Sequence, residues 1–163
     1  MTPEVAEPQP SWAAQPAGDL PDVNVWLALT VSDHPHHGVA RAYWENAAAP
    51  RLWFCRVTML ALVRLLCQPR VMGEAALELA QAFDVYRRFT ALPEIGFRGE
   101  PEGCEPSLEA MASALEPPLP ARLWTDAYLA AFAVGAGLRL VTFDRDFDRF
   151  AGLDCLRLPA SAG

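Results

Sequence analysis

The chain has 163 residues, a formal net charge of −7 and four cysteines, none of them in a Cys-x-x-Cys pair. This length is that of one domain and can bury a core without disulfide or metal cross-links. Hydrophobic residues make up 52%, which excludes a chain that is disordered throughout. The longest apolar stretches, residues 57–67 and 127–138, are too short to cross a bilayer, and the N-terminus lacks the basic and apolar regions of a secretion signal. We therefore expect a cytoplasmic protein in a reducing compartment, with no membrane partner.

The acidic residues are unevenly distributed along the chain. Eight of them lie in residues 1–19 and 99–118, which contain no basic residue. All 13 basic residues are arginine, and they lie in the rest of the chain. The negative net charge therefore does not exclude a nucleic-acid substrate, and it gives no support for one either.

The first part of the chain alternates strand-like and helical stretches. Residues 1–18 are rich in Pro, Ala, Gln and Glu, and this composition predicts a disordered N-terminal tail. Pro35 suits a first helical turn, and Thr58 can cap a helix that ends before Pro69. The predicted elements are, in chain order, a strand at 20–23, helices at 24–31 and 35–48, a strand at 52–57 and a helix at 58–68.

The second part continues this alternation. The stretch 74–90 is amphipathic, and Thr125 can cap a later helix. The predicted elements are a helix at 74–90, a strand at 95–97, helices at 106–115 and 123–136, a strand at 138–143, a short helix at 146–150, a strand at 155–158 and a C-terminal tail at 159–163. This order predicts one α/β domain over residues 19–158, with a mostly parallel central sheet flanked by helices.

Three acids fall at one edge of this predicted sheet. Asp22 ends the first strand, Asp144 closes the strand 138–143, and Asp126 occupies the first turn of the helix 123–136. Ligands of open parallel sheets bind beyond the carboxyl ends of the strands. Carboxylates gathered there repel one another unless a cation joins them, and Mg²⁺ or Mn²⁺ prefers such oxygen ligands. Taken singly, each of these acids is more often a helix-cap or turn residue.

Four local sequences resemble the motifs of one family, in that family's order. Residues 20–29 (LPDVNVWLAL) contain an acid followed by x-Asn and an apolar helix start, and residues 34–44 begin His-Pro-His-His. Residues 124–131 (WTDAYLAA) and 140–147 (LVTFDRDF) carry the later acids. These segments are similar to the motifs of PIN domains, and in particular of VapC-type toxin ribonucleases. The resemblance runs from about residue 20 to residue 158.

The resemblance implies a fold, an activity and partners. The fold would be PIN-like, and the activity would be that of an Mg²⁺- or Mn²⁺-dependent endoribonuclease that hydrolyses RNA phosphodiester bonds. VapC-type proteins are the toxins of type II toxin–antitoxin pairs, so a cognate VapB-like antitoxin would restrain this chain. Related toxins commonly form homodimers.

The motifs also indicate which side chains would form the site. Three carboxylates would be catalytic metal ligands: Asp22, Asp126 and Asp144. Asp146 would be a weaker, second-tier ligand or would hold a water molecule. Asn24 and Thr142 would orient the site by hydrogen bonding.

One position departs from the family's pattern. PIN domains usually carry a glutamate on the helix after the second strand, whereas residues 58–64 (TMLALVR) contain no acid. The site could work with fewer carboxylates, or Glu45 late in the preceding helix could fill in as a metal ligand, or the activity could be weakened or lost. The alternative prediction is therefore a catalytically weakened PIN-like module that binds RNA or protein. An aspartyl phosphatase is a further possibility, but residues 22–24 lack its usual second aspartate.

Two further features have two interpretations each. His34, His36 and His37 could bind a transition metal, but their spacing fits no known zinc pattern, and a polar turn that touches RNA is the other interpretation. Arg145 could hold a phosphate or pair with neighbouring acids.

Overall fold

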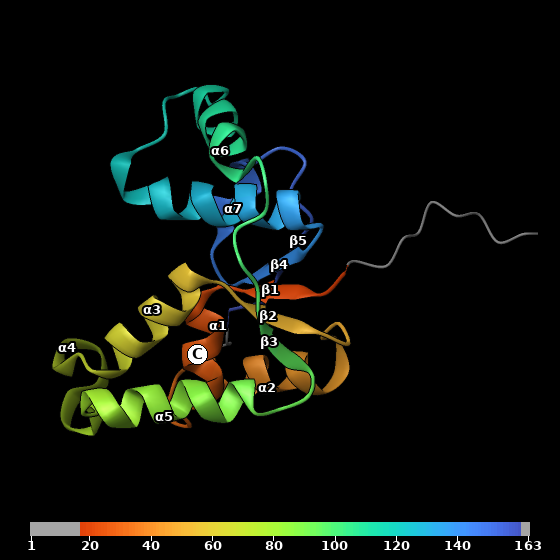
Figure 1. Cartoon of the computed structure of the whole chain (residues 1–163). Coiled ribbons are helices and arrows are strands. Elements are labelled where there is room, and N and C mark those ends of the chain that lie inside the picture. Colours follow the sequence, from red (N-terminus) through yellow and green to blue (C-terminus); the bar gives the residue numbers. More distant parts are fainter. Residues whose placement is uncertain (1–16, 161–163) are drawn as a thin grey trace, which may run out of the picture.

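The computed structural model describes residues 17–160 as five strands and ten helical segments (Figure 1). The strands are β1 (Asp19–Pro21), β2 (Leu52–Phe54), β3 (Ile95–Phe97), β4 (Arg139–Thr142) and β5 (Cys155–Arg157). The α-helices are α1 (Val23–Thr30), α2 (His37–Asn46), α3 (Arg56–Leu66), α4 (Pro69–Met72), α5 (Leu79–Thr90), α6 (Cys104–Ser113) and α7 (Trp124–Ala136). Three short 3₁₀ turns complete the fold: η1 (Gly73–Ala75), η2 (Ala121–Leu123) and η3 (Arg145–Arg149).

The strands form one sheet in the order β3-β2-β1-β4-β5, and every pair is parallel. The chain builds outward from β1 to β2 and β3, then returns to the other side of β1 for β4 and β5. The direction of winding therefore changes between β1 and β4. In open parallel sheets, a crevice for ligands forms beyond the carboxyl ends of the two strands at such a change.

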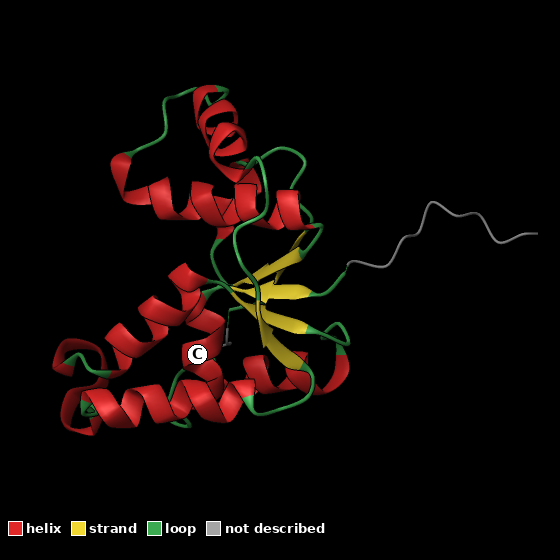
Figure 2. Ribbon diagram, viewed as in Figure 1, coloured by secondary structure: helices red, strands yellow, loops and turns green. Residues whose placement is uncertain are grey.

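Helices cover both faces of the sheet (Figure 2). Helices α6 and α7 lie on one face, and α1, α2, α3 and α5 lie on the other (Figure 1). Successive residues of a strand point to opposite faces. Leu140 accordingly belongs to the core on the α7 side, together with Phe132, whereas Val141 belongs to the core on the α1 side, together with Trp26. Both faces are buried, and for this reason the strands read as short apolar runs.

The two cores differ in their side chains. On one side, α7 packs a run of small residues against the sheet, with Ala130, Ala131 and Ala133 fully buried. On the other side, Trp26 is fully buried and stacks on Phe54, with ring centroids 3.9 Å apart. The predicted α/β fold with a parallel sheet is confirmed.

The predicted helix at 74–90 starts too early. Helix α5 begins at Leu79, and residues 69–75 form α4 and η1 instead. The backbone N–H of Leu77 donates to the carbonyl oxygen of Leu66 at 2.8 Å, which ties the segment before α5 to the end of α3. The apolar spacing continues through Leu77 because that side chain packs on the core without being helical.

Two predicted helix caps are also wrong. Thr58 is the third residue of α3, and its hydroxyl accepts a hydrogen bond from the backbone N–H of Cys55, the true cap, at 3.0 Å. Thr125 lies inside α7, because residues 121–123 already form the turn η2 that leads into that helix.

Residues 17 and 18 are hydrogen-bonded to the rest of the domain. The backbone N–H of Ala17 donates to Gly137, and the carbonyl oxygen of Gly18 accepts from the N–H of Arg139. A side chain on Gly18 would lie 2.6 Å from the carbonyl oxygen of Arg51, so this close approach requires glycine. The rest of the predicted tail, residues 1–16, and residues 161–163 lie outside the described part. Within residues 17–160, no helix is both long and apolar enough to cross a membrane.

Candidate active site

Asp22 follows β1 directly and caps the N-terminus of α1. Its Oδ1 accepts from the backbone N–H of Val23 at 2.7 Å, and its own N–H donates to the carbonyl oxygen of Val141 at 2.8 Å. Only 6% of Asp22 is exposed, and no arginine of the described chain pairs with it. Burial, opposed by its hydrogen bonds and aided by the charge of Asp144, raises the pKa of Asp22 from 3.8 to about 6.

Thr142 joins Asp22 to Asp144 across the two central strands. The Thr142 hydroxyl donates to Oδ2 of Asp22 at 3.2 Å, and it accepts from the backbone N–H of Asp144 at 3.0 Å. Thr142 is fully buried. Asp144 in turn caps η3 by accepting from the backbone N–H of Asp146 at 2.8 Å. These bonds hold the carboxylates that follow β1 and β4 in fixed positions at the change of winding.

Asp126 reaches the same place from the first turn of α7. Desolvation and then the charges of Asp22, Asp144 and Asp146 raise the pKa of Asp126 from 3.8 to about 6, and nearby Arg122 opposes this rise. The structure therefore brings together four acids from three distant segments. We call Asp22, Asp126, Asp144 and Asp146 the acid cluster.

Asp146 differs from the other members because it has cationic partners. Arg149 donates to its Oδ1 at 2.6 Å, and Arg122 donates to its Oδ2 at 3.2 Å. The hydrogen bond from Arg122 is the largest of the effects that lower the pKa of Asp146. The pairing with Arg122 could not be predicted from local sequence, because Arg122 lies 24 residues from Asp146.

Two predicted site residues are not in contact with the acids. Asn24 is exposed on the first turn of α1, and in the described part its amide makes no hydrogen bond to the acid cluster. Glu45 lies on α2, where it accepts from Arg41 at 2.5 Å beside Trp44 and Phe89. The structure therefore does not bring Glu45 to the cluster, and α3 supplies no acid either.

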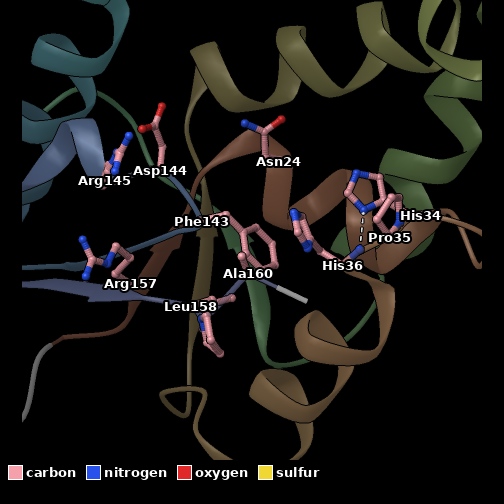
Figure 3. A pocket seen from close by; sticks show the side chains of 11 residues that line it. Asn24, His34, Pro35, His36, Phe143, Asp144, Arg145, Arg157, Leu158 and Ala160 are labelled. Atoms are coloured by element: carbon pink, nitrogen blue, oxygen red, sulfur yellow. Dashed lines mark hydrogen bonds between the residues drawn. The ribbon is translucent and has the colours of Figure 1, made fainter. Parts of the chain in front are cut away.

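A hollow of about 830 Å³ opens next to the cluster (Figure 3). It is bounded by Asp144 and Arg145 on one side and by His34 and His36 on the other, with Phe143 between them. The three histidines do not form a metal site with one another or with acids, because the described residues hold no group of three potential ligands close enough to bind one ion.

The same finding applies to the acid cluster: its carboxylates lie near one another but not as a closed cage. Mg²⁺ is usually held through one or two carboxylates, retains several waters and takes further oxygens from substrate phosphates. Carboxylate oxygens are hard ligands and suit such an open site. Burial and repulsion between neighbouring acids raise the pKa of two of the carboxyl groups, those of Asp22 and Asp126. The residues present therefore fit a divalent cation of this kind.

Comparison with known proteins identifies the family of this chain. The family model for the PIN domain matches residues 20–153. This chain belongs to the PIN domain family. Ribonuclease VapC41 of Mycobacterium tuberculosis is 40% identical to this PIN domain over 146 residues, which are 86% of this chain and 98% of VapC41.

Solved structures show the same fold at lower identity. VapBC-1 of Haemophilus influenzae matches with a TM-score of 0.62 and 16% identity, covering 85% of this chain and 96% of that one. VapC20 of Mycobacterium tuberculosis, described as a sarcin-ricin loop cleaving toxin, matches with a TM-score of 0.61 and 18% identity, covering 83% and 95%. The predicted PIN-like fold is thus confirmed for the described chain.

Proposed function

We propose that this PIN domain is an Mg²⁺- or Mn²⁺-dependent endoribonuclease and the toxin of a VapBC-like toxin–antitoxin pair. The observation that carries the proposal is the acid cluster at the change of winding, where buried Asp22 has no cationic partner in the described chain. The 40% identity to Ribonuclease VapC41 supports RNA as the substrate.

The cluster members would have different roles. Asp22, Asp126 and Asp144 would hold the cation as the catalytic carboxylates, and Asp146, already paired with two arginines, would act from further away through water. A divalent cation bound there can activate water and stabilise the negative charge that develops on a phosphodiester. Thr142 would hold Asp22 and the backbone of Asp144 in position through its two hydrogen bonds.

The partners follow from the family. We propose a VapB-like antitoxin that covers the site, a homodimer as the toxin's own assembly, and the cytoplasm as the compartment. The structural similarity to VapBC-1 supports the first of these. The domain would comprise residues 19–158.

Two observations favour a second candidate function. Helix α3 carries no acid, and Glu45 pairs with Arg41 away from the cluster. A PIN domain with weakened catalysis would still bind RNA or a protein partner through the same surface.

Cleavage of total bacterial RNA by the purified protein, free of antitoxin, separates these two functions. The wild type is incubated with Mg²⁺ or Mn²⁺, beside an EDTA control, Asp22→Asn, and Asp84→Asn as a surface control on α5. Discrete fragments that need metal and that appear with the wild type and Asp84→Asn support the nuclease. Intact RNA in every lane, from folded protein, supports the binding module instead.

A further inference from the structure

Most residues that line the hollow beside the acid cluster have no role in the proposed cleavage reaction. It is lined by residues from the start of α1, the turn before α2, the segment after β4 and the end of β5 (Figure 3). Its volume of about 830 Å³ lies within the range of small-molecule sites, and it shares Asp144 with the cluster. A molecule bound there would therefore lie directly beside the reacting phosphate.

Two rings form a flat surface in this hollow. His36 stacks on Phe143, with ring centroids 4.6 Å apart and planes inclined by 22°. The turn that carries His36 is fixed, because Nδ1 of His34 accepts from the backbone N–H of His36 at 3.1 Å (Figure 3). Burial and the neighbouring histidines lower the pKa of His34, which keeps this ring neutral and able to accept that bond.

Positive charge lines the side of the hollow that adjoins the cluster. Arg145 is exposed and forms no ion pair with any acid of residues 17–160. Arg157 also lines the hollow and pairs with Asp148 at 2.5 Å. An arginine without an acidic partner, next to a carboxylate site for a cation, is suited to a phosphate group.

We propose that this hollow binds one unpaired RNA nucleotide next to the phosphate that is cleaved. The base stacks on the pair of His36 and Phe143, and the nucleotide's phosphate contacts Arg145. The exposed amide of Asn24, at the rim, offers both a donor and an acceptor to the base edge. The proposal rests on the ribonuclease function and adds to it where the chain grips its substrate.

The chemistry of the hollow favours single-stranded RNA over a duplex. Proteins recognise unpaired RNA by splaying out a base and stacking it on aromatic side chains, whereas the bases of a duplex have no free face. The stacked rings of His36 and Phe143 line the hollow, and the guanidinium of Arg145 lies on the side toward the acids (Figure 3).

Binding of a short, fluorescently labelled unpaired RNA, measured by anisotropy, tests the proposal without requiring cleavage. All proteins carry Asp126→Asn to prevent turnover. Each is titrated with the RNA and with an abasic strand of the same length. Base–aromatic stacking predicts that Phe143→Leu weakens binding of the intact RNA by about 10-fold and leaves the abasic strand unaffected. Phe143→Tyr, which retains the ring, should bind like the parent protein.

Two controls match the substitutions in size and charge. Phe83→Leu replaces a half-buried phenylalanine on α5, and Arg88→Ala removes an exposed arginine of the same helix. Neither should change binding of either strand. Arg145→Ala should weaken both strands equally and reduce the salt dependence of binding, because a phosphate contact does not depend on the base.

The outcomes distinguish failure of the proposed nucleotide site from failure of the proposed nuclease activity. Unchanged RNA binding by Phe143→Leu, or equal losses for the intact and abasic strands, overturns the nucleotide site whether or not the wild type cleaves RNA. Base-dependent binding that needs Phe143, from a wild type that never cleaves RNA, overturns the nuclease and keeps the nucleotide site. Failure of the parent protein to bind the labelled RNA overturns the nucleotide site, and the nuclease is overturned with it only if the wild type also leaves total RNA intact.

Discussion

Asp19 and Asp22 stand at opposite ends of the region around β1, three residues apart, and both are buried. Asp19 is surrounded by partners: Arg139 donates to it twice, at 2.8 and 2.9 Å, Tyr43 donates its hydroxyl at 2.6 Å, and the backbone N–H of Ala49 donates at 2.9 Å. Among the described residues, the Asp22 carboxylate accepts hydrogen bonds only from Val23 and Thr142.

This difference separates a structural carboxylate from a functional one. A buried charge is costly unless a counter-charge and hydrogen bonds compensate for it. At the amino end of the sheet, Arg139 supplies that compensation from within the chain. At the carboxyl end, no cationic side chain of residues 17–160 pairs with Asp22, and burial raises the pKa of Asp22 to about 6. The ion pair of Asp19 and Arg139 stabilises the fold, whereas the Asp22 carboxylate is available to a ligand.

The largest effect is expected from breaking the ion pair between Asp19 and Arg139. Asp19→Asn leaves Arg139 without its partner, and loss of one member of a buried pair costs about 3–5 kcal/mol. We expect the free energy of unfolding, measured by urea titration, to fall by that order. Asp84→Asn removes an exposed pair with Arg87 and should leave stability nearly unchanged. Equal effects of the two substitutions would contradict the structural role of Asp19.

Neutralising the Asp22 carboxylate should lower activity and raise stability. Asp22→Asn should reduce metal-dependent RNA cleavage more than about 100-fold, beyond the roughly 10- to 100-fold cost of losing a ligand's hydrogen-bond partner. Since the pKa of Asp22 is about 6 in the folded chain and 3.8 ordinarily, the folded state takes up the proton first as pH falls. Ionised Asp22 therefore lowers stability above pH 6, and this cost disappears below about pH 4.

Thermal unfolding across pH checks that second effect. In the absence of metal, Asp22→Asn should have the higher Tm at pH 7 to 8, because its free energy of unfolding should exceed that of the wild type by about 3 kcal/mol, and the two proteins should converge near pH 4. Added Mg²⁺ should raise the Tm of the wild type alone. A variant that is less stable than the wild type at every pH would refute the unpaired state of Asp22.

A smaller effect is expected from removing the Thr142 hydroxyl, which bonds to both Asp22 and Asp144. Thr142→Val removes the hydroxyl between Asp22 and Asp144, and Thr58→Val removes an equally buried hydroxyl that bonds only to Cys55. Both should cost about 1–2 kcal/mol of stability. Only Thr142→Val should weaken Mg²⁺ affinity, by roughly 10-fold, as measured by calorimetry. Similar metal affinity in both variants would mean that Thr142 does not position the site.

The smallest effect is expected at Glu45. Its pair with Arg41 is exposed and lies away from the acid cluster, so Glu45→Gln should change stability by less than about 0.5 kcal/mol. RNA cleavage and Mg²⁺ affinity should stay at wild-type levels. A clear loss of cleavage would return Glu45 to the set of metal ligands and would require α2 to move.

The sequence by itself determined the class of fold and the local setting of the acids. Apolar runs such as residues 138–143 favour a buried strand, and the direction of β1 and β4 places Asp22 and Asp144 at the carboxyl edge of the sheet. The start of α5 could not be predicted in this way, because Leu77 keeps the helical spacing of apolar residues while its backbone bonds to Leu66.

Only the tertiary structure decided which acids are paired. The partners of Asp19 lie 24, 30 and 120 residues away, and Arg122 lies 24 residues from Asp146. Local sequence cannot show such pairs, because burial and counter-charges are set by how distant segments pack. The tertiary structure likewise separated Glu45 from the cluster and stacked His36 on Phe143. The sequence supplied the carboxylates, and packing determined which of them lack a cation.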